Sequence, residues 1–545
     1  MLVCMIPAVS LTSFAEEKPT IEPDISWYTY SPSENKTFYL YDAADLLGLA
    51  QIMSVNSTTI DSTQVKSSAD RFNSSGSYKH TFVLMNDIDL NPGWDASSDE
   101  APANAWPTFG VAFNFQGVID GNGHTIKGIY FDNSYNGLGI LGQINGRSAE
   151  IKDLTIENSY YKSNNGNAGF LFGYVKASPT LLSFSNVYVE ATIEQTTAAG
   201  YMGGFIGFND STNNGTANIK IENCVFDGNI DAMYTGSGNC GIGGFIAGNN
   251  SASTTISIKN SASYMNVTCS AATDERVFVG GLVGLNLNAA IELSNCVGSV
   301  DSTVTGNKVC VGALAGGSRY ADTAAAKYNF TGECYYTGDT PVGCTFKNAS
   351  PYTYVTSGDD YNTSATNVAT NAKKPANNQT LSDAVSGWTG WSANGNKPMP
   401  TEVLNMLTTP VAEIVGYQAT DAEDDGKFNF RIVGVLNVEE EDLANTILSI
   451  SATATYTLDG EKTLTLENYP INTVYTSIDG NSDTGLVTYT AKELGGNYIF
   501  VLPCKNVPAN ATDIKVEIIV TYAVNDGNGT ATRTLYVEAP KDAVN

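Results

Sequence analysis

Apolar and polar residues alternate in short segments that recur along the middle of the chain. The pattern apolar-x-apolar-x-Asn occurs six times, with its Asn residues 25, 28, 37, 37 and 35 positions apart. Alternation with a period of two is typical of a strand with one buried face, and Asn tolerates the left-handed backbone of a tight corner. Each copy therefore predicts one strand followed by one corner. The copies end at Asn133, Asn158, Asn186, Asn223, Asn260 and Asn295.

A second signature, a short apolar segment flanked by glycines, lies between these predicted strands. Glycine lets the backbone bend without a steric penalty from Cβ, so each flanked segment is predicted to form another wall of the same coil. Two signatures that recur in step, with a period of about 20 to 50 residues, indicate a solenoid whose stacked coils bury one continuous core. The glycine-flanked copies span 139–142, 169–173, 203–207, 243–248, 280–284 and 312–316.

Together, the two signatures resemble those of the GLUG-motif family of bacterial surface proteins. Residues 113–126 are similar to the first coil of that family, and residues 82–90 and 106–110 are similar to segments that precede it. The resemblance covers residues 37–345 approximately. It implies an all-β protein whose central part is a right-handed parallel β-helix-like solenoid.

The residues before the repeats predict an export signal and a cap. Residues 1–14 are apolar or small and uncharged, and Ser13-Phe14-Ala15 suits signal peptidase, so we expect cleavage after Ala15 and export. Further on, residues 38–52 predict a strand and then a helix that Asp42 caps, with Asp45 in its first turn. This segment is expected to cover the open end of the solenoid, because a bare strand edge recruits other chains.

The residues after the repeats predict two further parts. Residues 349–379 are polar and predict an irregular segment, and residues 388–400 are expected to form a closing coil. From residue 411, seven spaced strands with Asp-Gly turns predict an Ig-like β-sandwich. The predicted map is a signal peptide (1–15), a linker (16–36), an N-terminal capping segment (37–108), the solenoid (109–345), the irregular segment and closing coil (346–410) and the sandwich (411–545).

Charge narrows the classes of partner. The chain has 56 Asp and Glu residues against 28 Lys and Arg residues, a formal charge of -28. This charge repels phosphate backbones, so no nucleic-acid partner is expected. No later stretch approaches the ~20 apolar residues of a membrane-spanning helix. No motif implies a cofactor.

One pair of carboxylates is a candidate catalytic site. When the copies are aligned on the Asn, the residue four positions later is Lys162, Glu190, Asp227, Tyr264 and Ser299 in successive turns. Neighbouring strands lie about 4.8 Å apart, close to the carboxylate separation of about 5 to 5.5 Å in a retaining glycosidase. Glu190 and Asp227 are therefore either an acid and nucleophile pair or part of a solvated acidic row, with Lys162 and Glu190 as a surface ion pair.

Two kinds of metal site, a zinc site and a calcium site, are considered. Some proteins with GLUG motifs are metalloproteases, but a His-Glu-x-x-His zinc site cannot be built from His80 and His124, the two histidines present. The turn that contains Asp421, Asp424 and Asp425 is either a calcium site or an ordinary acidic turn.

The cysteines are interpreted from the coil register. Cys224 and Cys296 both follow a corner Asn but are predicted to lie two coils apart, about 9 to 10 Å, which is too far for a disulfide. We therefore expect no bond between them. Cys334 and Cys344 flank a short segment and either close a hairpin or remain thiols.

Three functions remain open on the sequence alone. The first is an exported, surface-associated or secreted adhesin-like protein that binds an extracellular glycan or a host or cell-surface protein, with Tyr160, Tyr161 and Tyr264 as candidate contacts. Ordinary strand packing is the alternative role of these tyrosines. The second function is a carbohydrate-active enzyme, a polysaccharide lyase or glycoside hydrolase, which a groove around Glu190 and Asp227 would favour. The third is a structural spacer.

Overall fold

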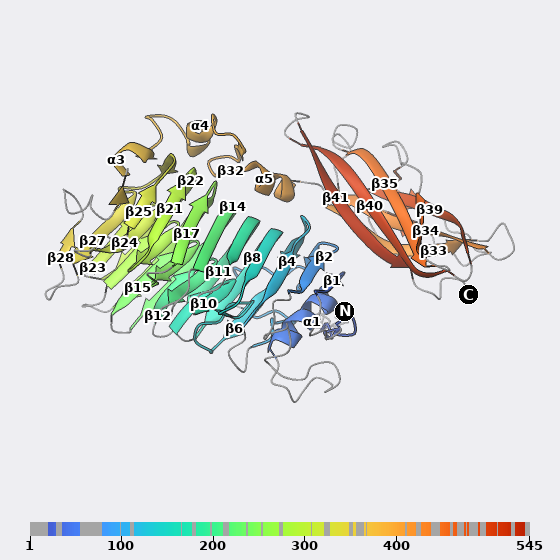
Figure 1. Cartoon of the computed structure of the whole chain (residues 1–545), viewed down its shortest axis with the longest axis horizontal. Coiled ribbons are helices and arrows are strands. Elements are labelled where there is room, and N and C mark those ends of the chain that lie inside the picture. The colour runs from blue at the N-terminus through green and yellow to red at the C-terminus, as the bar shows by residue number, and fades with distance from the viewer. Residues whose placement is uncertain are drawn as a thin grey trace, which may run out of the picture.

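The computed structural model describes residues 20–539 with gaps, the widest at 55–78, 356–364, 438–446, 466–473, 479–488 and 491–497. The predicted signal peptide lies outside the described residues. Strands dominate the rest, and most of them stack as parallel walls of a solenoid (Figure 1). The predicted all-β solenoid is confirmed.

The first wall is the largest sheet, and its strands pair in parallel from turn to turn. The ladder starts before residue 109 and continues beyond residue 345, so it runs past both ends of the repeat region. Its strands are β1 (Thr37–Leu40), β2 (Thr81–Leu84), β3 (Ile88–Asp89), β4 (Gly117–Asp120), β5 (Thr125–Lys127), β6 (Tyr130–Asn133), β8 (Ala149–Ser163), β11 (Leu182–Gln195), β14 (Ala217–Tyr234), β17 (Thr254–Lys259), β18 (Ala262–Ala271), β21 (Ala290–Ser294), β22 (Cys296–Thr305), β25 (Lys327–Phe330), β26 (Cys334–Tyr336), β29 (Ala365–Thr366) and β30 (Ala372–Lys373).

Two smaller sheets form the other walls. One contains β7 (Ile144–Asn145), β10 (Phe172–Lys176), β13 (Ile206–Asp210), β16 (Ile246–Asn249), β20 (Val283–Asn286), β24 (Ala315–Tyr320), β27 (Val342–Lys347) and β28 (Thr353–Val355). The other contains β9 (Gly166–Gly169), β12 (Ala199–Gly203), β15 (Asn239–Gly243), β19 (Arg276–Gly280) and β23 (Lys308–Gly312). The inward side chains of all three walls belong to one apolar core, which α1 (Ala43–Ser54) covers at the N-terminal end.

A column of left-handed residues forms one corner of the solenoid, with φ between 47° and 53° in every member. Amide side chains join successive turns, since Asn186 donates to Asp153 at 2.7 Å and Asn223 donates to Asn186 at 3.1 Å. The prediction that an Asn ends each strand at a corner is confirmed from Asn186 onward. It is wrong for Asn133 and Asn158, which are not members of this column. The corner column is Asn122, Asp153, Asn186, Asn223, Asn260 and Asn295.

The glycine-flanked signature marks a bend and not a strand. Residues 203–207 cover the end of β12, a bend, and the start of β13. The two walls approach so closely there that a Cβ on Gly203 would lie 2.1 Å from the carbonyl oxygen of Ile206. The apolar residue inside the bend, Phe205, is fully buried in the core. These glycines are therefore required by the close approach of two backbones.

The predicted closing coil is wrong. Residues 388–400 form a short antiparallel hairpin, β31 (Trp391–Ser392) and β32 (Met399–Pro400), and do not extend the ladder. The hairpin lies between α4 (Leu381–Val385) and α5 (Thr401–Thr408), and we call residues 380–408 the strap. After α3 (Val368–Asn371), the strap runs back along the outside of the solenoid from β26 to β14, β11 and β8 (Figure 1).

An apolar row on the outer face of the first wall explains why the strap packs there. Tyr188, Val225, Ala262 and Val297 stand in register on four neighbouring strands and point outward. Left uncovered, such a row would expose apolar surface across several turns. The strap covers it with Leu381, Val385, Met399 and Val403, all of them buried.

The C-terminal strands form two antiparallel sheets around a separate core. The three-stranded sheet contains β33 (Val411–Thr420), β34 (Lys427–Asn437) and β39 (Tyr498–Pro508), and the four-stranded sheet contains β36 (Glu461–Thr465), β35 (Ile447–Thr457), β40 (Thr512–Val524) and β41 (Gly529–Ala539). A two-stranded pair, β37 (Ser477–Ile478) and β38 (Tyr489–Thr490), lies beside them. The core takes residues from both sheets, as in a β-sandwich.

The cysteines give one disulfide among the described residues, between Cys310 and Cys344, with their Cα atoms 5.6 Å apart. The hairpin bond considered for Cys334 and Cys344 is therefore wrong. Cys334 lies on β26, in the first wall, whereas Cys344 lies on β27, in a different wall. Cys224 and Cys296 are separate buried thiols, as the register predicted.

Candidate functional site

The outer face of the first wall is hollowed where β8, β11, β14 and β18 run side by side. Two depressions, with volumes of about 450 Å³ and 250 Å³, share lining residues and form one continuous groove. The lining is predominantly polar. We call the two depressions together the groove. The residues that line both depressions are Ala96, Ser97, Thr192, Asn229 and Asn266.

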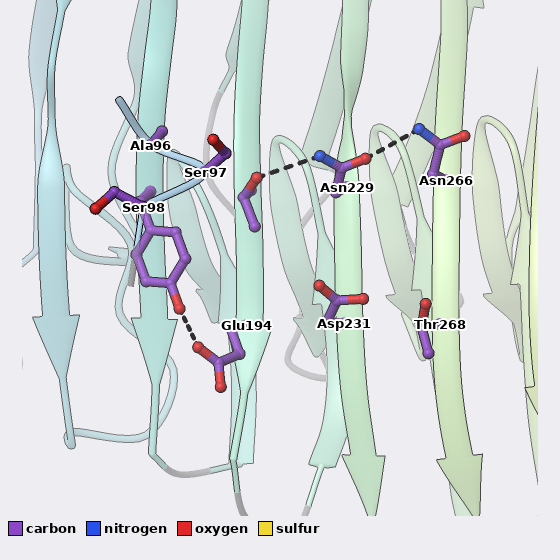
Figure 2. A pocket seen from close by; sticks show the side chains of 10 residues that line it. Ala96, Ser97, Ser98, Glu194, Asn229, Asp231, Asn266 and Thr268 are labelled. Atoms are coloured by element: carbon purple, nitrogen blue, oxygen red, sulfur yellow. Dashed lines mark hydrogen bonds between the residues drawn. The ribbon is translucent and has the colours of Figure 1, made fainter. Parts of the chain in front are cut away.

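The floor of the groove follows from strand alternation and register. Thr192, Asn229 and Asn266 occupy the same outward position on three neighbouring strands. Figure 2 shows Asn229 and Asn266 side by side, with Asn266 donating to Asn229 at 2.9 Å, and Asn229 donates to Thr192 at 3.3 Å. The floor is thus a row of hydroxyl and amide groups that runs across the strands.

Aromatic rings continue the same row at its N-terminal end. Tyr160 stands in register with Thr192, and Tyr130 stands in register with Tyr160. The two rings are nearly parallel, at 7°, with centroids 5.6 Å apart, and the ring of Trp94 meets Tyr130 edge-on. Both tyrosines are half-buried, so part of each ring faces solvent.

A bulge in β8 holds the rim of the groove. Asn158 has a left-handed backbone, with φ 46°, and an extra residue breaks the register between β8 and β11 at this point. Its side chain donates to the carbonyl of Trp94 at 2.6 Å and accepts from the backbone N–H of Ala96 at 2.8 Å. Asn158 is therefore not a corner residue. It fixes the segment 95–98 against the wall.

Two rows of carboxylates flank the floor. Glu190 and Asp227 are directly in register on β11 and β14. Glu194 and Asp231, two positions past the floor residues, are in register on the same two strands (Figure 2). Partial burial, with the charges of Glu157 and Asp227, raises the pKa of Glu190 above its usual value. Burial also raises the pKa of Asp231, and Glu194 adds to this. The hydroxyl of Tyr160 donates to Glu194.

The strap supplies a cation to one end of the groove. The ammonium of Lys397 contacts both carboxylate oxygens of Asp227, at 2.7 and 2.8 Å. It also lies 5.8 Å from the centre of the Tyr264 ring, within the range of a cation–π contact. Lys397 is half exposed, so this pair is accessible to solvent.

The predicted catalytic pair is brought together, since Glu190 and Asp227 both line the groove. The predicted ion pair between Lys162 and Glu190 is wrong, because the bulge at Asn158 shifts Lys162 opposite Glu194.

Of the predicted binding tyrosines, one lies in the groove and two do not. Tyr160 lines it. Tyr161 is fully buried and donates to the carbonyl of Leu138 at 2.6 Å. Tyr264 is buried under the strap and donates to the carbonyl of Pro398. The expectation that Tyr161 and Tyr264 are exposed is wrong. The calcium candidates Asp421, Asp424 and Asp425 lie outside the described residues.

Sequence reasoning missed the floor of the groove, although the signal was present. The residues six positions after the corner residues Asn186, Asn223 and Asn260 are Thr192, Asn229 and Asn266, all of them polar. Lys397 and the rim segment 95–98 have no such signal, because they reach the groove through contacts distant in sequence.

Within the described residues, no cluster of three or more His, Cys, Asp or Glu side chains could hold a metal ion. The same residues include no helix long and apolar enough to cross a membrane.

No family model matches the chain, and no curated protein matches it in sequence. Among solved structures, the chain is similar to a crystal structure from Bacteroides ovatus described as a "putative immunoglobulin A1 protease". The identity is 17%, the match covers 67% of this chain and 92% of that chain, and the TM-score is 0.41. A likeness of this size leaves function to be argued from the chain's own groove, and the resemblance to the GLUG-motif family stays a prediction.

Proposed function

We propose that this chain is an exported β-solenoid protein that binds an extended glycan in the groove and does not cleave it. Export rests on the signal-like residues 1–15, and the assignment of a glycan rests on the chemistry of the groove. The ligand lies across the strands, along the row that runs from Tyr130 to Asn266.

The observation that carries the proposal is this single row of side chains. Half-buried tyrosine rings at one end suit the apolar faces of sugar rings. The hydroxyl and amides of Thr192, Asn229 and Asn266 suit sugar hydroxyls, because each can both donate and accept hydrogen bonds. The groups recur once per strand, so an extended chain with repeating hydroxyls meets a repeating set of partners.

Binding without cleavage is favoured by the state of Asp227. A retaining glycosidase needs one protonated and one free carboxylate on either side of the scissile bond. Both oxygens of Asp227 contact Lys397, which reduces their availability to attack a sugar carbon.

A glycoside hydrolase is the second candidate, and one observation favours it. Glu190 and Asp227 lie in register in the same groove, and the pKa of Glu190 is raised while Asp227 is ion-paired. Two carboxyls whose environments differ in this way are the pattern of a general acid beside an ionised partner.

One experiment separates the two candidates and the spacer. The full chain is first screened on a glycan array, and the bound glycans are then incubated with wild type and with the Glu190→Gln, Asp227→Asn double variant. The proposal predicts retained glycan and no new reducing ends or unsaturated uronates from either protein. Product from wild type alone would establish the enzyme instead. If the chain binds no glycan on a broad array, the role of a structural spacer is favoured.

A further inference from the structure

Two buried thiols face each other in adjacent turns near the C-terminal end of the solenoid. Cys296 begins β22 and Cys334 begins β26, and the two residues stand directly opposite in a parallel pair. Both side chains are fully buried and belong to the same core. Neighbouring strands lie about 4.8 Å apart, inside the Cα separation of about 4.4 to 6.8 Å that a disulfide spans.

We propose that Cys296 and Cys334 form a disulfide in the exported protein, which makes them a second covalent link between two turns that Cys310 and Cys344 already join. The two links lie on different walls. Cys296 and Cys334 connect strands of the first wall, whereas Cys310 and Cys344 connect β23 to β27 across a corner. Together they fasten a pair of turns at two points around the coil.

The bond forms by ordinary thiol–disulfide exchange with a small or protein disulfide as oxidant. One cysteine thiolate attacks the oxidant and forms a mixed disulfide, releasing one thiol. The second cysteine then displaces the remaining half of the oxidant. The cysteines lose two electrons and two protons in total, and the oxidant leaves as two thiols.

Burial determines when this reaction takes place. Burial and contact with Cys296 raise the pKa of the Cys334 thiol well above its usual value. Since the thiolate is the reactive form, the folded dithiol reacts slowly and the bond closes while the last turns are still forming. An oxidant present during folding should therefore act far faster than the same oxidant added afterwards.

Cys224 provides an internal comparison. It occupies the same core position two turns earlier and is fully buried. The residue opposite it in the next turn is Ser261, whose hydroxyl accepts from the backbone N–H of Cys224 at 3.1 Å. With a serine in place of a neighbouring cysteine, Cys224 stays a thiol.

The link would stabilise the end of the solenoid. Terminal turns of a stacked repeat protein have a neighbour on one side only and open first. A bond that closes the loop of chain between Cys296 and Cys334 restricts the unfolded chain and opposes this opening.

Peptide mapping of the full chain tests the proposal. The reduced, unfolded protein is refolded with glutathione disulfide until the Cys310–Cys344 link is complete, blocked with an alkylating agent under denaturing conditions, and digested without reductant. We expect a Cys296–Cys334 linked peptide and an alkylated Cys224. Alkylation of Cys296 and Cys334 to the same extent as Cys224 would overturn the proposal, as would a link from either one to Cys224. Oxidant added only after reductive refolding should close the Cys296–Cys334 bond at least tenfold more slowly, and equal rates would contradict closure before burial.

Discussion

The ammonium of Lys397 contacts both carboxylate oxygens of Asp227, although 170 residues separate the two along the chain. The contact exists because the strap packs on the apolar outer row of the solenoid and carries Lys397 to the end of the groove. The strap therefore has two effects. It covers apolar surface, and it supplies a positive charge to a groove whose other charged lining residues are carboxylates.

Releasing the strap should expose that surface without unfolding the solenoid. Val403, on α5, is fully buried against the outer face of the first wall. A carboxylate at this position would be buried without a partner. We expect Val403→Asp to increase hydrogen exchange throughout residues 380–408 and to leave β11 and β14 protected. Glu402→Gln, an exposed neighbour on the same helix, is the control. Loss of protection in β11 and β14 would show that the strap is part of the solenoid's cooperative core.

A buried carboxyl in α1 should make stability depend on pH. Asp45 is 9% exposed, and burial raises its pKa from 3.8 to about 6. Between these two pH values the folded state binds more protons than the unfolded state. The contribution of Asp45 to the free energy of unfolding is therefore largest below pH 4 and falls as pH rises to 6. The contribution is at most about 3 kcal/mol.

The isosteric variant Asp45→Asn isolates this effect. Its amide oxygen can still accept from the backbone N–H of Tyr41, which the carboxylate accepts at 2.8 Å. We expect the free energy of unfolding of the variant to gain on wild type between pH 4 and 6. Parallel curves across this range would mean that Asp45 ionises normally.

At a corner position, a glycine variant should be more stable than an alanine variant, which is the reverse of the order expected within a strand. Asn186 has φ 53°, a conformation that costs a residue with Cβ about 1 to 2 kcal/mol and costs glycine nothing sterically. Alanine and glycine both lose the hydrogen bonds of Asn186, so their difference reports the backbone alone. In urea unfolding we expect Asn186→Gly to be more stable than Asn186→Ala. At the adjacent Ser185, within β11, alanine should be the more stable, and the same order at both positions would refute the corner assignment.

The register from Asn186 onward was predictable because the corner residues there are separated by nearly equal lengths, 37 and 35 between hydrogen-bonded neighbours. The copy that ends at Asn158 was misaligned because this Asn lies in a bulge, which adds a residue to β8. A local pattern of apolar and polar residues cannot distinguish such a bulge from a corner, since both place an Asn after an alternating segment.

The candidate site was predictable only where it is periodic. Counting from the corner placed Glu190 beside Asp227 correctly, because both residues lie on regular strands. Lys397 and the rim held by Asn158 depend on segments that dock from far along the chain, and no period connects them to the wall. Tyr160 and Tyr161 are neighbours on β8, so strand alternation can place only one of them on the outer face, and Tyr161 is the one that points into the core.

The boundary near residue 410 remains a prediction. Helix α5 ends at Thr408 and β33 begins at Val411, and the core of the sandwich shares no residue with the core of the solenoid. We expect limited proteolysis to cut within residues 400–415 and to release a stable C-terminal fragment. Cleavage confined to residues 130–310 would contradict this division of the chain.

The central claim is that the groove holds the ligand, and calorimetric titration of a glycan identified on the array tests it most directly. The Asn229→Ala, Asn266→Ala double variant removes two exposed amides from the floor, and Asn218→Ala removes one from the same strand, β14, outside the groove. At about 1 kcal/mol for each hydrogen bond, the double variant should bind roughly tenfold to thirtyfold more weakly than wild type, with Asn218→Ala unchanged. Equal affinities for wild type and the double variant would contradict the account.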